Sequence, residues 1–305
     1  MAQATVNFWT EALKRPITIN VIFPTDKICV AHGKIPKSAP MKTLYLLEGV
    51  TGNYSGMLGY TRIQALAEDY NICIVMASGE NKWYANSDIS GEYHADLIAK
   101  DLVQFTRQTF NLSDRREDTY IGGFSMGGFG AAVIGLSHPE LFSHIILLEA
   151  ALHKAKIMAS SNAPTSDERL DLLTKSQYET AFGLKDIKDF EGCPSDYEYL
   201  ARKLAESGAE KPKVFFNDGK LGTMHKVDVP FKELLDSLGY ETTMTWAPGG
   251  HSWATLELGL KDALDWLPLD TFEGNVPEYD PMTHFSGDAF FHGQPYYTVI
   301  NNQNS

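Results

Sequence analysis

A serine flanked by glycines is the clearest candidate for chemistry in the chain. It stands in the run Gly123-Phe124-Ser125-Met126-Gly127, directly after a predicted strand and directly before a predicted helix rich in small residues. Glycines on both sides of the serine remove the Cβ atoms that would clash in a tight strand-to-helix turn. The helix that begins at Met126 directs backbone N–H groups and its dipole toward negative charge that develops beside the serine. This pattern predicts that Ser125 is the nucleophile of an acyl-transfer reaction.

A serine nucleophile needs a general base, because its hydroxyl is weakly nucleophilic at neutral pH. Nine histidines are available. His251 lies in the loop PGGHSW (residues 248–253), after the last predicted strand and before a predicted helix. It also comes last in the order serine, acid, histidine that such sites follow along the chain. We therefore expect His251 to be the base, and we expect His225 to lie in a loop that could line the site.

Two backbone amides are expected to stabilise the oxyanion. One belongs to Met126, and the other should come from the loop that follows an early strand. The predicted strand 43–47 runs into the turn EGVTG (residues 48–52), whose glycines let the backbone bend close to a substrate. Val50 is the expected second donor, and Gly49 is the alternative.

The elements that must position these residues alternate between short β-like runs and helical patterns. This alternation predicts an α/β domain with a mostly parallel sheet and helices on both faces. Several strands are nearly all apolar, as expected for strands that are buried on both faces. The predicted strands are Ile17–Phe23, Thr43–Leu47, Ile72–Ala77, Thr119–Phe124, His144–Glu149, Lys213–Asn217 and Thr242–Trp246. The predicted helices are Ala95–Phe110, Met126–Ser137, Val229–Leu238 and Leu256–Trp266.

Two regions interrupt this alternation. Residues 150–211 separate two predicted strands by far more than an ordinary crossover, which predicts an inserted cap or lid. The segment after Pro268 is rich in proline, glycine, asparagine and aromatic residues and has no clear periodicity. We therefore expect one domain over residues 1–268 and a C-terminal tail, residues 269–305, that docks on this domain or on a second subunit.

The charge and composition of the chain disfavour several classes of partner. The 305 residues carry a formal net charge of −13, which argues against binding to nucleic acid or to an anionic membrane surface. No apolar run approaches the roughly 20 residues that span a bilayer, and the N-terminal residues lack a signal-peptide pattern. Three widely separated cysteines, Cys29, Cys73 and Cys193, fit a reducing compartment, and Cys73 is expected in the core. These features predict a cytoplasmic globular protein.

A longer resemblance surrounds the serine. Residues 122–131, GGFSMGGFGA, resemble the nucleophile region of the esterase D-like group of α/β-hydrolases, which includes tributyrin esterases, S-formylglutathione hydrolases and feruloyl and acetyl-xylan esterases. The runs LEGVTGNY (residues 47–54) and PGGHSW resemble the oxyanion and histidine loops of that group, with Glu48 where its members usually carry histidine. The resemblance, which covers the chain from about Val6 to Leu267, implies the α/β-hydrolase fold. It also implies a short-acyl carboxylesterase that needs no cofactor or metal and is often oligomeric.

The resemblance fails at the acidic residue that orients the histidine. Gly222 stands where the family carries its aspartate, three residues after a glycine that ends the penultimate strand. Asp218 is the preferred substitute, because it lies at the end of that strand and needs only a shifted loop. Glu149 is the second choice, because it ends the strand after the nucleophile helix, where the family usually has serine. Asp228 is the third choice, although its position before Val229-Pro230 favours a helix N-cap.

The expected reaction is hydrolysis of a small carboxylic ester through an acyl-enzyme. Ser125 attacks the carbonyl, His251 passes the proton to the leaving alcohol, and water then releases the acyl group. Two alternatives stay open: an acyltransferase that uses the same acyl-enzyme, and a binding protein whose catalysis is weakened or lost. Trp83 and Tyr84 lie where the family lines its acyl or alcohol site, although they can equally be packing aromatics.

Overall fold

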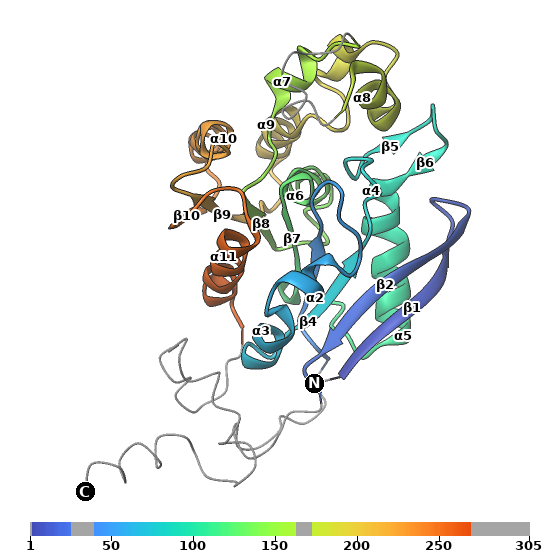
Figure 1. The fold of residues 1–305 in the computed structure, drawn as a ribbon, viewed down its shortest axis with the longest axis vertical. Helices are drawn as coiled ribbons and strands as arrows, with labels where there is room; N and C mark the ends of the chain where they lie inside the picture. The colour runs from blue at the N-terminus through green and yellow to red at the C-terminus, as the bar shows by residue number, and fades with distance from the viewer. Residues whose placement is uncertain (1, 26–39, 163–172, 270–305) are drawn as a thin grey trace, which may run out of the picture.

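An eight-stranded sheet forms the centre of the computed structural model, which describes residues 2–25, 40–162 and 173–269 (Figure 1). The strand order is β1-β2-β4-β3-β7-β8-β9-β10. β1 pairs antiparallel with β2, and β2 with β4, whereas all pairs from β4 to β10 are parallel. The strands of this sheet are β1 Ala2–Thr10, β2 Arg15–Phe23, β3 Thr43–Leu47, β4 Cys73–Ala77, β7 Thr119–Phe124, β8 His144–Leu148, β9 Lys213–Gly219 and β10 Thr242–Ala247. A separate hairpin pairs β5 Asn86–Ser87 with β6 Glu92–Tyr93.

Helices cover both faces of the sheet, which confirms the predicted fold class (Figure 1). The longer helices are α3 Ile63–Asp69, α5 Val103–Thr109, α6 Met126–Ser137, α8 Lys175–Phe182, α9 Tyr197–Ser207, α10 His225–Ser237 and α11 Trp253–Trp266. The shorter ones are α2 Gly56–Tyr60, α4 His94–Asp96, the π-helical turn η1 Leu97–Leu102, α7 Lys154–Met158 and the 3-10 turns η2 Arg116–Asp118 and η3 Ile187–Phe190.

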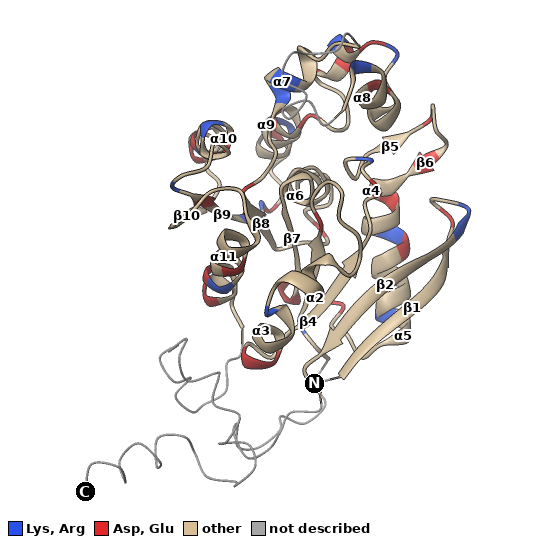
Figure 2. Ribbon diagram, in the orientation of Figure 1, with Lys and Arg blue, Asp and Glu red and all other residues tan. Residues whose placement is uncertain are grey.

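The core lies in two layers because side chains alternate along each buried strand. On β3, Tyr45 and Leu47 belong to the layer under α5, α6, α9 and α10, whereas Leu44 and Leu46 belong to the layer under α3 and α11. All residues of β3, β4, β7 and β8 are buried. Lys, Arg, Asp and Glu are interspersed over the outer helices, and β3, β4 and β7 carry none of them (Figure 2).

All seven predicted strands are present, with ends that differ by one or two residues at most. The edge strand β1 was not predicted; only its last residues alternate clearly between buried and exposed. The helix predicted over Val229–Leu238 begins four residues earlier, at His225, because bonds from the first turn to Thr223 and Met224 already wind the chain before Pro230. The predictions that His225 lies in a loop and that Asp228 caps this helix are therefore wrong.

The described part of the stretch between β8 and β9 consists of helices joined by loops. It carries α7, α8, η3 and α9, and α9 packs against α6 on the sheet (Figure 1). Its action as a lid stays a prediction, and the predicted tail lies outside the described residues except for Leu269. Cys29 also lies outside them, whereas Cys73 and Cys193 are buried free thiols. No helix in the described ranges combines the length and apolarity needed to cross a bilayer.

Candidate active site

Ser125 lies in the turn between β7 and α6 with φ 57° and ψ −117°. Residues other than glycine rarely adopt a positive φ, and such a conformation persists only where the surroundings hold it. Here the N–H of Ser125 donates to the carbonyl of Leu148 over 3.1 Å. Its own carbonyl accepts from the N–H groups of Phe129 (3.1 Å) and Ala151 (2.9 Å). These three bonds hold the serine in its strained turn at the end of the sheet.

The glycines on either side of the serine allow a close approach of backbone to backbone. A Cβ atom on Gly123 would lie 2.2 Å from the carbonyl carbon of Gly127. A Cβ atom on Gly127 would lie 2.2 Å from the carbonyl oxygen of Leu47, the last residue of β3. A side chain at either position would push α6 away from the sheet. The glycines therefore bring Ser125 next to the loop that follows β3.

His251 lies directly before α11, whose N-cap Ser252 accepts the N–H of Thr255. The imidazole ring stacks on Phe124, with 4.5 Å between ring centroids and 16° between planes. Because Phe124 precedes Ser125 in the chain, this stack places the imidazole in the vicinity of the nucleophile. The side chain of His251 is 34% exposed. Within the described residues, the Ser125 hydroxyl has no hydrogen bond to His251, a bond that in many enzymes tightens only with substrate.

Glu149 is the carboxylate that contacts the histidine. Its Oε2 lies 2.9 Å from Nδ1 of His251, and its Oε1 accepts the N–H of Gly219. The residue has φ 46°, and its own N–H donates to the carbonyl of Asn217 over 2.8 Å. The side chain of Glu149 is 1% exposed. A buried carboxylate held at both oxygens can fix the orientation and tautomer of an imidazole.

The structure reverses the preferred order of the candidate acids. Asp218 was the first choice, but both of its carboxylate oxygens are buried and make no hydrogen bond within the described residues. The reason is that β9 continues to Gly219, so Asp218 is still a strand residue and its side chain projects from a face of the sheet. Asp228 also lies away from His251, because its Oδ2 accepts the N–H of Ala150 over 2.9 Å.

The turn after β3 comes close to the nucleophile. A Cβ atom built on Gly49 would lie 3.3 Å from the Cβ of Ser125. The N–H of Thr51 donates to Asn81 Oδ1 (2.7 Å) and that of Gly52 to the carbonyl of Gly49 (3.1 Å). The amides of Gly49 and Val50 donate to no acceptor in the described part of the chain. Both candidate donors therefore stay available to an oxyanion, as does the N–H of the first residue of α6, which has no intrahelical partner.

The side chain of Glu48 links this turn to the loop that follows β4. Its Oε1 accepts the N–H of Gly79 over 2.7 Å, whereas its Oε2 is buried without a partner in the described residues. Burial raises the pKa of the Glu48 carboxyl to about 7. Its backbone N–H donates to the hydroxyl of Tyr84 over 3.0 Å. The side chain that replaces the usual histidine of this loop is therefore a structural part of it.

For Trp83 and Tyr84 the sequence left two interpretations, lining of the substrate site and packing in the core. Both are buried, with exposed fractions of 2% and 0%. Trp83 packs against the rings of Phe129, Tyr178 and Phe182. Tyr84 reaches the site only through its hydroxyl, which contacts the turn after β3. The packing interpretation of these aromatics is the one that the structure supports.

A row of aromatic rings that the sequence did not reveal borders the histidine. Trp253 lies 5.8 Å from Phe124 and stacks on Tyr60, with 4.7 Å between centroids and 21° between planes. Tyr60 is 64% exposed. The row therefore extends from the surface to the imidazole. Two of its members stand inside the serine and histidine motifs, but nothing in the sequence places Tyr60 beside them.

One cluster has residue types that can ligate a metal ion. Ligand atoms of Glu80, Glu92 and His94 lie within 4.8 Å of one another. Arg15 contacts Glu80 and lies 3.8 Å from Glu92, and Lys82 lies 3.1 Å from Glu92. Burial lowers the pKa of His94 to about 4, so the imidazole is neutral. Because two cations already neutralise the two carboxylates, we interpret the cluster as an ion-pair network that ties the loop after β4 to β2.

Comparison with known proteins identifies the family. Residues 10–180 match the family model named Esterase, described as "Putative esterase". An acetyl esterase of Caldicellulosiruptor saccharolyticus is 32% identical over 267 residues, which are 88% of this chain and 98% of that protein.

Two solved structures from Staphylococcus aureus share the fold. One is FphF, a fluorophosphonate-binding serine hydrolase, with a TM-score of 0.73 and 24% identity over 87% of this chain and 98% of that one. The other is an S-formylglutathione hydrolase, with a TM-score of 0.71 and 23% identity over 88% and 99% of the two chains. The chain, which has the α/β-hydrolase fold, belongs to the esterase family.

Proposed function

We propose that this protein hydrolyses short-acyl carboxylic esters through an acyl-enzyme, with Ser125 as nucleophile, His251 as general base and Glu149 as the acid of the triad. The observation that carries the proposal is the 2.9 Å contact between His251 Nδ1 and Glu149 Oε2, which leaves Nε2 to face a substrate. The stack of the imidazole on Phe124, next to the strained Ser125, supports the same assignment.

Acylation begins when the Ser125 hydroxyl attacks the ester carbonyl. His251 Nε2 takes the hydroxyl proton as the Oγ–C bond forms, and Glu149 stabilises the imidazolium that results. The oxyanion accepts hydrogen bonds from the amides of Met126 and Val50, with Gly49 as the alternative to Val50. When the tetrahedral intermediate collapses, the C–O bond to the alcohol breaks, and the imidazolium gives its proton to the departing oxygen.

Deacylation repeats these steps with water. His251 removes a proton from the water molecule as its oxygen attacks the acyl carbonyl, and the same two amides hold the new oxyanion. Collapse of this second intermediate breaks the bond between the acyl carbon and Ser125 Oγ, which regains its proton from the imidazolium. The products are the free acid and the resting enzyme.

The preference for short acyl groups rests on the acetyl esterase relative. A series of p-nitrophenyl esters tests it, because the leaving group stays constant while the acyl chain grows from acetate through butyrate to octanoate. We expect kcat/KM to be highest for acetate or butyrate and to fall for octanoate. A maximum at octanoate would contradict the short-acyl assignment and leave the triad unaffected.

The nucleophile is tested by Ser125→Ala with p-nitrophenyl acetate. We expect kcat to fall by at least about 10⁴-fold, because removal of a triad member leaves only the oxyanion donors and binding. Mass spectrometry of wild-type peptides after rapid acid quenching should locate an acetyl group on the peptide that contains Ser125. Unchanged turnover in the variant, or acetylation at another residue, would overturn the assignment.

A further inference from the structure

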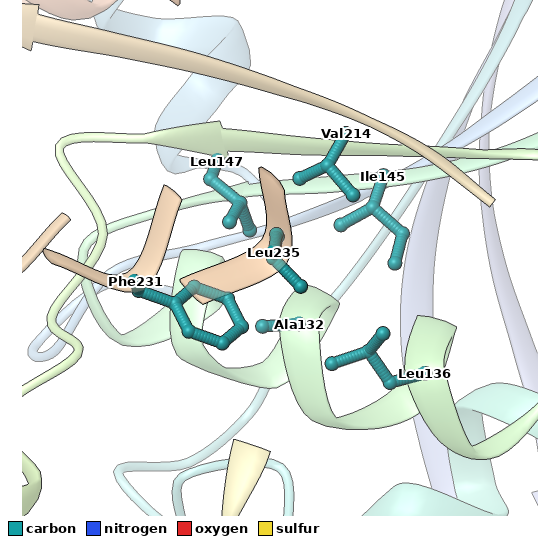
Figure 3. Close-up of a pocket in the computed structure, with 7 residues that line it drawn as sticks. All are labelled: Ala132, Leu136, Ile145, Leu147, Val214, Phe231 and Leu235. Carbon is teal, nitrogen blue, oxygen red and sulfur yellow. The ribbon is translucent and has the colours of Figure 1, made fainter. Parts of the chain in front are cut away.

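The contact between β9 and α10 is apolar in the body of the sheet and carries acidic side chains at its end next to the active site. In the body of the sheet it is apolar: side chains of α6, β8, β9 and α10 converge there, and the space left among them does not admit a water molecule (Figure 3). Phe216 of β9 packs against Phe231 of α10, with 6.3 Å between ring centroids. Asp218 follows Phe216 by two residues and so projects from the same face of the strand. Asp228 precedes Phe231 by three residues and shares its helix face. The same contact therefore ends in two facing carboxyl groups.

If both carboxyl groups are ionised, their oxygens receive too few hydrogen-bond donors. Asp218 and Asp228 are both 0% exposed. Of their four oxygens, only Asp228 Oδ2 receives a donor, the N–H of Ala150. The other three are buried and have no partner in the described residues. A buried carboxylate without donors is costly, and two of them side by side also repel each other. One retained proton, carried by one carboxyl group and donated to the other, relieves both costs.

The environment decides which of the two groups keeps the proton. Burial raises the pKa of Asp218, whereas its contact with Asp228 and the nearby His225 and His251 act in the opposite direction. Burial and the neighbouring charge of Asp218 raise the pKa of Asp228 well above its ordinary value. Glu149 raises the pKa of both. The stronger rise at Asp228 favours the proton on this group and the negative charge on Asp218.

The two carboxyl groups flank the acid of the proposed triad. Asp228 holds the N–H of Ala150, the residue that follows Glu149. Asp218 precedes Gly219, whose N–H donates to Glu149 Oε1. A negative charge on Asp218 is therefore close enough to stabilise the imidazolium of His251. This effect adds to that of the Glu149 carboxylate, which contacts the imidazole directly.

From this arrangement we infer that Asp218 and Asp228 share one proton and act as positioning residues for the triad. Neutral Asp228 fixes the backbone beside Glu149, and the charge of Asp218 adds to that of Glu149 in stabilising the His251 imidazolium. The inference rests on the proposed function for its catalytic part, whereas the shared proton is independent of catalysis.

The isosteric variants Asp218→Asn and Asp228→Asn separate these two roles. Asp218→Asn removes the charge, which makes the His251 imidazolium less stable. We expect the acid limb of kcat/KM against pH to move to lower pH by roughly half a unit or more, and plateau kcat to fall about 3- to 10-fold. Asp228→Asn replaces one neutral donor by another. It should leave the acid limb in place, because the total charge of the pair does not change.

Infrared spectroscopy detects the proton without turnover. At about pH 8.5, above the pKa of Glu48 of about 7, the wild type should retain the carbonyl stretch of a protonated carboxyl group. This band should be absent in Asp228→Asn and present in Ser125→Ala, so a failure of the proposed catalysis cannot be mistaken for a failure of the shared proton. The inference is overturned if the wild type lacks the band, if Asp218→Asn leaves the acid limb unmoved, or if Asp228→Asn shifts it equally. The wild-type spectrum decides the matter if a variant does not fold.

Discussion

Glu149, Asp218 and Asp228 are three buried carboxyl groups that differ in the donors they receive. Glu149 has a donor or an imidazole nitrogen at each oxygen, whereas three of the four oxygens of the aspartates have no partner in the described residues. This difference makes Glu149 a firm anchor for His251. It also leaves the aspartates dependent on a proton, although Asp218 of β9 and Asp228 of α10 lie at the same end of the sheet as Glu149.

Glu48 predicts a specific dependence of stability on pH. Its pKa is about 7 in the folded chain, against an ordinary value of 4.5, because burial disfavours its charged form. Between these pH values the Glu48 carboxyl binds more protons in the folded chain than in the unfolded chain. The stability that depends on its protonated form is therefore fully present below about pH 4.5 and is lost as pH rises through 7. Glu48→Gln cannot ionise and keeps an acceptor for the N–H of Gly79. The unfolding free energy of Glu48→Gln minus that of the wild type should therefore be larger at pH 8 than at pH 5, by up to about 2–3 kcal/mol.

Urea unfolding of both proteins at several pH values measures this difference. The exposed Glu206→Gln serves as the matched control, because its side chain lies on the solvent side of α9. The control should run parallel to the wild type across the same pH range. If the unfolding free energy of Glu48→Gln also ran parallel to that of the wild type across this pH range, the buried, protonated state of Glu48 would be contradicted.

At the scale of elements, the loop after β4 acts as a brace for the turn after β3. Four non-glycine residues of the segment 80–84 have positive φ, so the loop is held by its surroundings. Three bonds link it to the turn: Asn81 Oδ1 accepts from Thr51, the Tyr84 hydroxyl accepts from Glu48, and Gly79 donates to Glu48. The turn that supplies the proposed oxyanion donors is therefore positioned by a strained loop.

Tyr84→Phe tests this brace. The variant removes the hydroxyl that accepts the N–H of Glu48 and leaves a buried amide unpaired, which costs about 1–3 kcal/mol of stability. Tyr45→Phe is the matched control, because the Tyr45 hydroxyl is also buried but bonds Thr106, away from the turn. Both variants should lose comparable stability in urea unfolding, but only Tyr84→Phe should lower kcat for p-nitrophenyl acetate. An equal kcat in the two variants would show that the brace does not act on catalysis.

The central strands and the nucleophile turn were predictable because their signals are local. Apolar runs fix the strands, and the glycines around Ser125 fix the turn. The contact of His251 with an acid was not predictable, because Glu149 and Asp218 both stand near strand ends. The pairing of β10 with β9 as far as Gly219 keeps Asp218 inside the strand. Such pairing is a property of the assembled sheet and leaves no trace in the nearby sequence.

At the scale of the whole molecule, the proposed triad exists only once the parallel sheet is complete. Ser125 follows β7, Glu149 follows the neighbouring β8, and His251 follows β10, two strands further along the sheet. Because these strands are parallel, their carboxyl ends meet at one edge, where α/β proteins commonly place their sites. Residues far apart in the chain thereby converge there, and the apolar strands between them supply the rigid support.

The central claim, that Glu149 is the acid, is tested most directly by kcat/KM of Glu149→Gln and Asp218→Asn for p-nitrophenyl acetate. In Glu149→Gln, an amide N–H₂ toward Nδ1 of His251 favours the tautomer whose Nε2 carries a proton and cannot accept one from Ser125. We predict a loss of about 10²- to 10⁴-fold for Glu149→Gln and at most about 10-fold for Asp218→Asn. Near wild-type activity in Glu149→Gln, together with a large loss in Asp218→Asn, would contradict the account.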